Sequence, residues 1–174
     1  MSSTPEPLSV LFLCTGNSAR SQIAEALLSA RSKGRFRVGS AGVRPAPIVN
    51  PFAVETLRER GIEWTGHVPK TIDAIAHERW DFVITVCDNA QESCPIFPGQ
   101  PVFAHWGMPD PAEVVGEDSK KREAFRLTAL LLARRIDLLL ALPLETLERR
   151  AQEERLRAIG GSSSESQRTA KADA

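Results

Sequence analysis

One short segment of the chain combines a cysteine and an arginine at a spacing suited to oxyanion chemistry. Five residues separate Cys14 from Arg20, and Ser21 follows directly. A loop of this length can wrap one tetrahedral oxyanion with its backbone N–H groups, at the positive end of the following helix. Arg20 adds a permanently charged, planar fork for two oxyanion oxygens. The segment therefore predicts a thiol nucleophile that faces a bound oxyanion.

The residues inside this loop suit the same role. Gly16 permits a backbone conformation that a Cβ would hinder, and the Asn17 side chain can tie the loop together. The amides and helix dipole that bind an oxyanion also stabilise a thiolate, so we expect a lowered pKa for Cys14. The predicted oxyanion-binding residues are consecutive: Thr15, Gly16, Asn17, Ser18, Ala19 and Arg20.

The elements around the loop favour this catalytic interpretation. Residues 9–13 are a short apolar run without alternation, typical of a strand buried on both faces of a parallel sheet. Residues 21–31 carry apolar side chains at helical spacing. An inert cysteine and a surface arginine would give the same spacing by chance, but that alternative leaves the strand–loop–helix setting unexplained.

The rest of the chain alternates strands with helices. Further strands are predicted at 36–42, 82–86 and 101–105, and further helices at 50–61, from about 71 and at about 119–141. Asn50 before Pro51 is a good helix start, and Gly61 suits the end of that helix. The alternation predicts an α/β fold, a single doubly wound domain with a parallel sheet and helices on both faces.

Length and composition exclude several classes of protein. A chain of 174 residues suggests one domain, and 22 basic against 22 acidic residues disfavour a nucleic-acid binder. The most apolar stretch, 127–142, contains three charged residues, so it is a core-facing helix rather than a membrane span. The first eight residues lack a signal-peptide pattern, and three cysteines do not suit a secreted disulfide scaffold. We therefore expect a cytoplasmic protein.

Composition also divides the chain. Residues 1–7 read as an N-terminal extension, 8–144 as the folded domain, and 145–174 as a charged surface helix followed by a tail. The sequence after Gly160 has too few apolar side chains to pack, so we expect that tail to be disordered.

Several motifs together resemble a known superfamily. The segments 14–21 and 40–42 and the pair Asp110–Pro111 resemble the low-molecular-weight protein tyrosine phosphatases. Within that superfamily, Cys87, Cys94 followed by a proline, and 105–107 are similar to the arsenate reductases of the thioredoxin-coupled type. The resemblance covers roughly residues 8–142, nearly all of the predicted domain.

The resemblance implies a flavodoxin-like, four-stranded parallel sheet of order 2-1-3-4. In that order the first and third strands are neighbours at the switch point, where ligands bind beyond the carboxyl ends of the strands. Cys14 follows the first strand and Cys87 follows the third. We therefore expect both thiols at one crevice.

The resemblance also implies roles for the site residues. Cys14 attacks arsenate, Ser21 hydrogen-bonds its thiolate, and Asp110 protonates the departing oxygen. Cys87 and then Cys94 act as resolving thiols, which leaves a disulfide for an external thiol donor, thioredoxin or glutaredoxin, to reduce. The implied enzyme binds no cofactor of its own and acts as a monomer, without nucleic acid or membrane.

Two departures from the family stand out. Some of its arsenate reductases hold a potassium ion with residues that match Asn17, Glu25 and Ser40, but Lys70 stands where a fourth, acidic residue is expected. An ammonium there can replace the ion, so we predict no metal. The phosphatases commonly place tyrosines after the general-acid pair, whereas this chain has Ala112 there and no tyrosine anywhere.

Two alternative functions stay open at this stage. A phosphomonoesterase, acting on phosphotyrosine or a small phosphate, needs only Cys14, Arg20 and Asp110. A non-catalytic oxyanion sensor would reuse the fold without any chemistry. Cys87 and Cys94 discriminate reduction from hydrolysis, because reduction takes two electrons from a dithiol and hydrolysis has no use for one. The simpler alternative for these two cysteines is that both are apolar fillers. Asp110 has its own simpler explanation as a turn residue before proline.

Overall fold

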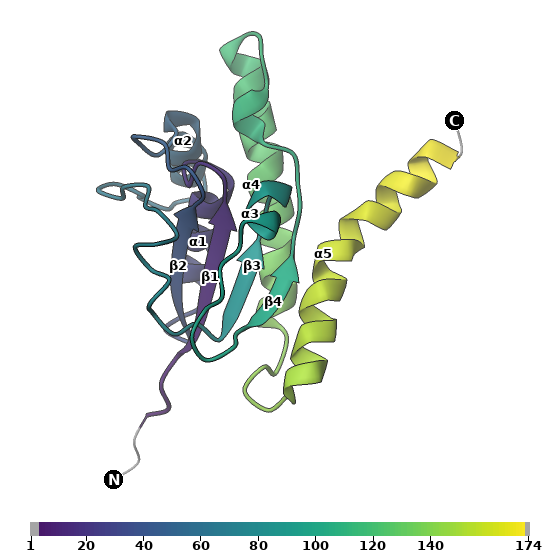
Figure 1. Cartoon of the computed structure of the whole chain (residues 1–174). Helices are drawn as coiled ribbons and strands as arrows, with labels where there is room; N and C mark the ends of the chain where they lie inside the picture. Colours follow the sequence, from purple (N-terminus) through teal and green to yellow (C-terminus); the bar gives the residue numbers. More distant parts are fainter. Residues whose placement is uncertain (1–3, 173–174) are drawn as a thin grey trace.

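A four-stranded parallel sheet forms the centre of the molecule, in the order β2-β1-β3-β4 (Figure 1). The computed structural model describes residues 4–172, with the backbone alone beyond residue 161. The strands are β1 (Leu8–Cys14), β2 (Phe36–Gly42), β3 (Phe82–Thr85) and β4 (Val102–His105). The strand order and the parallel pairing confirm the predicted flavodoxin-like topology.

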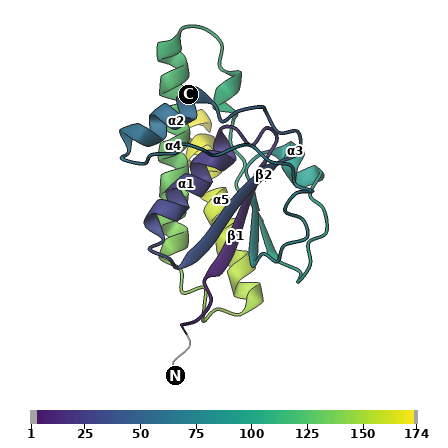
Figure 2. The same ribbon diagram turned by 90° about the vertical axis from the view of Figure 1, so that its left-hand side faces the viewer.

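Helices surround this sheet. They are α1 (Arg20–Arg31), α2 (Pro51–Glu59), α3 (Asp88–Glu92), a 3₁₀ turn η1 (Pro111–Glu113), α4 (Asp118–Leu140) and α5 (Arg149–Ala172). Figure 2 shows α1, α2 and α4 on one side of the sheet and α3 on the other. Helix α1 packs on β1, β2 and α4, and α5 lies along β4. Within residues 4–172, no helix has both the length and the apolar character of a membrane span.

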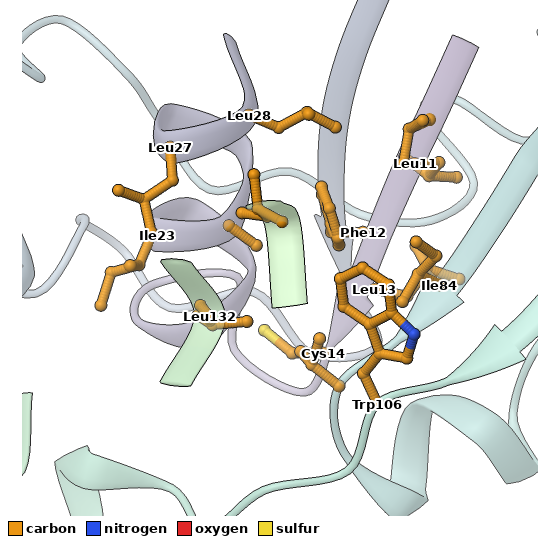
Figure 3. Packing of buried hydrophobic residues seen from close by; sticks show 14 of the residues in the cluster. Leu11, Phe12, Leu13, Cys14, Ile23, Leu27, Leu28, Ile84, Trp106 and Leu132 are labelled. Carbon is orange, nitrogen blue, oxygen red and sulfur yellow. The ribbon is translucent and has the colours of Figure 1, made fainter. Parts of the chain in front are cut away.

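The central strand β1 explains why the sheet forms around it. Its residues 10–13 have no exposed surface, because β2 and β3 flank it and both of its faces are covered. Phe12 packs against Trp106 with ring centroids 6.0 Å apart (Figure 3). Burying an aliphatic or aromatic side chain of this size contributes about 1.5–3 kcal/mol. The buried strand therefore fixes the position of the loop that follows it.

Local signals in the sequence place helix α2 correctly. The Asn50 side chain accepts a hydrogen bond from the backbone N–H of Phe52 at 2.9 Å, and Pro51 occupies the first helical position. Gly61, just beyond the helix, has a φ of +78°, which a residue with a Cβ adopts only with strain. The predicted start and end of this helix are both confirmed.

The helix expected from about residue 71 is absent, and turns replace it. Thr71 forms an isolated bridge with Gly42, and residues 73–77 form turns. The backbone hydrogen bonds of this segment close single turns, since Ala74 N and Ile75 N donate to the carbonyls three residues before them, while Ile72 N donates to the carbonyl of Gly42 at the end of β2. Ile72 and Ile75 are nevertheless both buried.

Helix α5 also differs from the sequence expectation. It runs through Ala172, where we expected a disordered tail after Gly160. Leu156 and Ile159, three residues apart, lie on one face of this helix and are buried, and Trp106 Nε1 donates to the carbonyl of Leu156 at 3.0 Å. The packed region therefore continues past residue 144, where the sequence analysis had ended the domain.

Candidate active site

The loop between β1 and α1 is held from outside by the chain that follows β2. Four loop carbonyls accept backbone hydrogen bonds of 2.8 to 3.1 Å, in the pairs Val43 to Cys14, Arg44 to Thr15, Ala46 to Gly16 and Asn50 to Ser18. Because the N–H and C=O of a peptide unit point in opposite directions, the loop amides are turned toward its interior. This is the geometry of an oxyanion cradle.

A glycine makes this close packing possible. A Cβ on Gly42 would lie 2.6 Å from the carbonyl oxygen of Thr15 and 2.9 Å from the backbone nitrogen of Asn17. Such distances force the backbone apart, so only glycine fits where β2 passes the loop. Asn17 itself has a φ of 49°, a left-handed conformation that asparagine tolerates better than most residues.

The sulfur of Cys14 lies at the base of the cradle and is almost fully buried, with 2% of the residue exposed. Its Sγ is 2.8 Å from Ser21 Oγ, and it accepts a hydrogen bond from the backbone N–H of Asn17 at 3.2 Å. The structure therefore brings together the predicted nucleophile and the serine that we expected beside it.

The expectation of a lowered pKa for Cys14 is not met. Burial raises the pKa of the thiol, because removing the sulfur from water disfavours its charged form. The hydrogen bonds from Ser21 and Asn17 and the charge of Arg20 act in the opposite direction, but burial outweighs them. The lowered pKa was expected from the stabilising groups alone, without the burial of the sulfur that the fold creates.

Arg20 and Asp110 meet at the mouth of the loop. Arg20 Nη2 lies 3.4 Å from Asp110 Oδ2, and Arg20 Nη1 donates to the carbonyl of Met108 at 3.0 Å. The Asp110 side chain is partly exposed and also accepts a hydrogen bond from the backbone N–H of Ala112 at 3.0 Å, at the start of η1. The sequence did not predict that the Met108 carbonyl accepts from Arg20, because no pattern of side chains identifies a backbone acceptor.

Cys87 lies against the same loop. Its Sγ is 3.2 Å from Thr15 Oγ1, and it caps α3 by accepting from the backbone N–H of Ala90 at 3.4 Å. The sequence analysis expected both thiols at one crevice, and the structure places Cys87 beside the residue next to Cys14.

Cys94 lies beyond the other end of α3 and is only partly buried. Burial raises the pKa of its thiol to about 11. All three cysteines are free thiols, so the structure represents the reduced protein. This burial therefore disfavours the Cys94 thiolate in the conformation of this structure.

The residues that match a potassium site in the family do not fit an ion here. Asn17 Oδ1 already accepts from Gln22 Nε2 and from the backbone N–H of Lys70, at 3.2 and 3.0 Å. Ser40 donates to Glu25 Oε2 at 2.6 Å. Burial raises the pKa of Glu25, while the Ser40 hydrogen bond and the Lys70 charge lower it. The oxygens are engaged with one another, and Lys70 supplies the nearby positive charge.

A histidine that the sequence analysis left without a role connects three elements of the site. His105 Nε2 is 3.0 Å from Asp88 Oδ1, and His105 Nδ1 is 2.7 Å from Thr85 Oγ1. The ring therefore links the ends of β3 and β4 to the first residue of α3. No sequence spacing identifies such a contact, because the partners are far apart in the chain.

Comparison with known proteins gives consistent matches. The family model for low molecular weight phosphotyrosine protein phosphatase matches residues 9–153. An arsenate reductase of Halalkalibacterium halodurans is 40% identical over 117 residues, which are 67% of this chain and 84% of that protein.

Solved structures agree with these sequence matches. The crystal structure of arsenate reductase from Archaeoglobus fulgidus has a TM-score of 0.63 and 31% identity, and the match covers 76% of this chain and 99% of that one. The thioredoxin-dependent arsenate reductase of Corynebacterium glutamicum has a TM-score of 0.53 and 33% identity, over 78% of this chain and 65% of that one. Since the family model spans most of the sequence, this chain belongs to the low molecular weight phosphotyrosine protein phosphatase family.

Proposed function

We propose that this protein reduces arsenate to arsenite through its three cysteines. The observation that carries the proposal is the position of Cys87, whose sulfur contacts the side chain of Thr15 in the oxyanion loop. A phosphatase that uses this loop needs no second thiol beside it, whereas a reductase needs one to take over the oxidation. The arsenate reductases among the relatives support the same choice.

The first step joins arsenate to the enzyme. The Cys14 thiolate attacks arsenic in an arsenate held by the loop amides and the Arg20 guanidinium, and an S–As bond forms as one As–O bond breaks. Asp110, 3.4 Å from Arg20, supplies the proton that lets this oxygen leave as water. Ser21, 2.8 Å from the sulfur, stabilises the thiolate before attack.

The next two steps move the oxidation away from the loop. The Cys87 thiolate attacks the sulfur of Cys14, the S–As electron pair stays on arsenic, and arsenite leaves with As(V) reduced to As(III). Cys94 then attacks Cys87, so that the Cys14 thiolate is released and a Cys87–Cys94 disulfide remains. Each sulfur–sulfur bond accounts for the two electrons that arsenic has gained.

An external dithiol closes the cycle by reducing the Cys87–Cys94 disulfide. The Corynebacterium glutamicum relative is named as thioredoxin-dependent, so we propose thioredoxin rather than glutaredoxin as the donor. Such a cycle works in a reducing compartment, which favours the cytoplasm. All the residues it uses belong to one chain, so we expect a monomer to be active.

The division of labour among the cysteines tests this function. Cys14→Ser removes the nucleophile and should abolish both arsenate reduction and hydrolysis of p-nitrophenyl phosphate. Cys87→Ser and Cys94→Ser should abolish arsenate turnover but leave the hydrolysis, which needs only Cys14, Arg20 and Asp110. The measurement is arsenite formation with thioredoxin, thioredoxin reductase and NADPH, run beside the phosphatase assay on the same preparations.

The retained hydrolysis serves as the control for folding of the two resolving-thiol variants. Wild-type arsenate turnover by Cys87→Ser or Cys94→Ser would refute the relay. Hydrolysis of phosphate esters by the wild type without any arsenate turnover would favour the phosphomonoesterase alternative instead.

A further inference from the structure

The side-chain amide of Asn17 is fully engaged and completely buried. Its oxygen accepts from Gln22 Nε2 and from the Lys70 backbone N–H, at 3.2 and 3.0 Å. Its nitrogen donates to Ser21 Oγ at 2.8 Å and to Ser40 Oγ at 2.9 Å. A backbone N–H can only donate, so the oxygen of Asn17 must face Lys70 and its nitrogen must face the two serines.

A second donor-only group fixes the neighbouring amide in the same way. Trp64 Nε1 donates to Gln22 Oε1 at 2.8 Å, and an indole N–H has no capacity to accept. The oxygen of Gln22 therefore faces Trp64, and its NH₂ group faces Asn17. Gln22 has no exposed surface and Trp64 is 8% exposed, so water does not compete for these bonds.

The directions of these bonds determine what Ser21 can do. The Ser40 hydroxyl donates its hydrogen bond to Glu25 Oε2, at 2.6 Å. Ser21 receives a hydrogen bond from Asn17, and its own hydroxyl proton remains for the Cys14 sulfur, 2.8 Å away. A donor that is itself accepting a hydrogen bond is a stronger donor. When Cys14 is a thiolate its sulfur can only accept, so the contact then runs from the Ser21 hydroxyl to the sulfur and favours the thiolate.

We propose that Trp64 and Gln22 are positioning residues for the nucleophile: with the Lys70 amide, they set the direction of a hydrogen-bond chain that runs from the Trp64 indole through Gln22, Asn17 and Ser21 to the sulfur of Cys14. The hydrogen bonds of this chain lead from Trp64 to Gln22 and from Gln22 to Asn17, so both residues act through other side chains. The inference rests on the proposed function only in taking Cys14 as the reacting thiol.

The test is the pH dependence of Cys14 alkylation. In the full chain with Cys87→Ser and Cys94→Ser, Cys14 is the one remaining thiol, and iodoacetamide reports its thiolate fraction. The Trp64 ring stacks on His67, and Trp64→Phe keeps a ring for this contact but removes the N–H donor. Gln22→Glu places a carboxylate oxygen against the side-chain oxygen of Asn17, so it replaces a hydrogen bond by a repulsion and should disrupt the hydrogen-bond chain more than Trp64→Phe does.

Both variants should move the midpoint of the alkylation profile to higher pH. The rate at neutral pH should fall about three- to tenfold, the scale expected when a hydrogen bond to a charged group is weakened rather than lost. Gln22→Glu should show the larger effect. Trp80→Phe is the matched control. Trp80 is also buried, and its Nε1 donates to the backbone carbonyl of Ile75, which is not part of the hydrogen-bond chain to Cys14.

A second background separates positioning from a general structural effect. Ser21→Ala interrupts the series of hydrogen bonds before it reaches the sulfur. Adding Trp64→Phe in this background should therefore cause no further shift of the alkylation midpoint. The proposal would be overturned if Trp64→Phe and Gln22→Glu had the same alkylation profile as the control Trp80→Phe. It would also be overturned if Trp64→Phe shifted the midpoint by the same amount in the Ser21→Ala background as in the protein that retains Ser21. If Trp64→Phe fails to fold by circular dichroism, Gln22→Glu decides when it is combined with Ser21→Ala, because a direct effect of its charge on Cys14 would persist there and an effect through the hydrogen bonds would not. Because alkylation needs no arsenate, failure of the proposed function would show separately in the arsenite assay.

Discussion

At the scale of single residues, the site contains two buried acids whose environments oppose ionisation. Burial raises the pKa of the Cys14 thiol and of the Glu25 carboxyl, while hydrogen bonds from neighbouring serines lower both. Ser21 acts on Cys14 and Ser40 acts on Glu25, and Asn17 donates to both hydroxyls. The reactivity of the sulfur therefore depends on how the hydrogen bonds of one asparagine are arranged.

Glu25 gives a prediction about stability and pH. Its pKa is raised in the folded protein, so the folded state holds this proton to higher pH than the unfolded state does. The stability that Glu25 contributes is complete below about pH 4.3, the ordinary pKa of a glutamate, and is lost as pH rises toward the folded pKa. The free energy of unfolding of wild type minus that of Glu25→Gln should therefore fall from pH 4 to 7 in urea titrations.

Glu59 is the control of opposite sign. The hydrogen bond from Arg126 lowers the pKa of this exposed carboxyl, so its contribution is present at neutral pH and is lost as pH falls. The difference between wild type and Glu59→Gln should rise with pH over the same range. A Glu25 difference that also rises with pH would contradict the burial argument.

At the scale of elements, helix α3 separates the two resolving cysteines. Cys87 and Cys94 are seven residues apart, and α3 spans Asp88–Glu92 between them. A continuous helix would hold their Cα atoms about 10 Å apart, whereas a disulfide requires about 7 Å or less. The contact of 3.0 Å between His105 and Asp88 holds the first turn of α3 in the reduced form. A helix continuous from Cys87 to Cys94 would therefore exclude the disulfide, and because α3 ends at Glu92 we expect only this short helix to unwind when the disulfide forms.

Hydrogen exchange should detect this change. In the oxidised protein, peptides covering residues 88–96 should exchange faster than in the reduced protein, because the helical hydrogen bonds and the Asp88–His105 contact are broken. Peptides from α4 provide the control, since that helix is remote from the disulfide in sequence and should exchange equally in both forms. Equal protection of 88–96 in the two forms would mean that no segment moves.

At the scale of the whole molecule, α5 secures the edge of the sheet that leads to Asp110. Arg135 of α4 donates to the carbonyl of Trp106 at 2.9 Å, and the Trp106 indole donates to Leu156 of α5. Gly160 lies so close that an added Cβ would collide with the carbonyl oxygen of His105 and the Trp106 ring. The start of the chain between β4 and Asp110 is therefore held by two helices from the C-terminal part of the sequence.

A core substitution in α5 measures how much this packing contributes. Leu156 has no exposed surface, so Leu156→Ala should lower the free energy of unfolding by about 2–5 kcal/mol, through lost burial and a cavity. Leu138→Ala is the matched control, because Leu138 of α4 is 49% exposed and its truncation should cost less than about 0.5 kcal/mol. Equal urea midpoints for the two variants would mean that α5 is not part of the folded unit.

Local patterns in the sequence were sufficient for the sheet and for the oxyanion loop. The apolar run that became β1, the spacing of Cys14 and Arg20, and the asparagine–proline start of α2 each act within a few residues of chain. Their outcome depends on sterics and short-range hydrogen bonds, which the sequence states directly. The strand order came from resemblance to a family, and the sheet topology confirms it.

Tertiary contacts decided the rest. Thr71 pairs with Gly42, and turns follow it where a helix was expected. Leu156 is buried where α5 packs on β4 and Trp106. The carbonyl of Met108 meets Arg20, and Trp64 meets Gln22, across 88 and 42 residues of sequence. The pKa of Cys14 likewise depends on burial that only the folded chain creates. Sequence alone determined which groups are available for chemistry, and the fold determined which partners they face, because contacts between distant segments have no local signal.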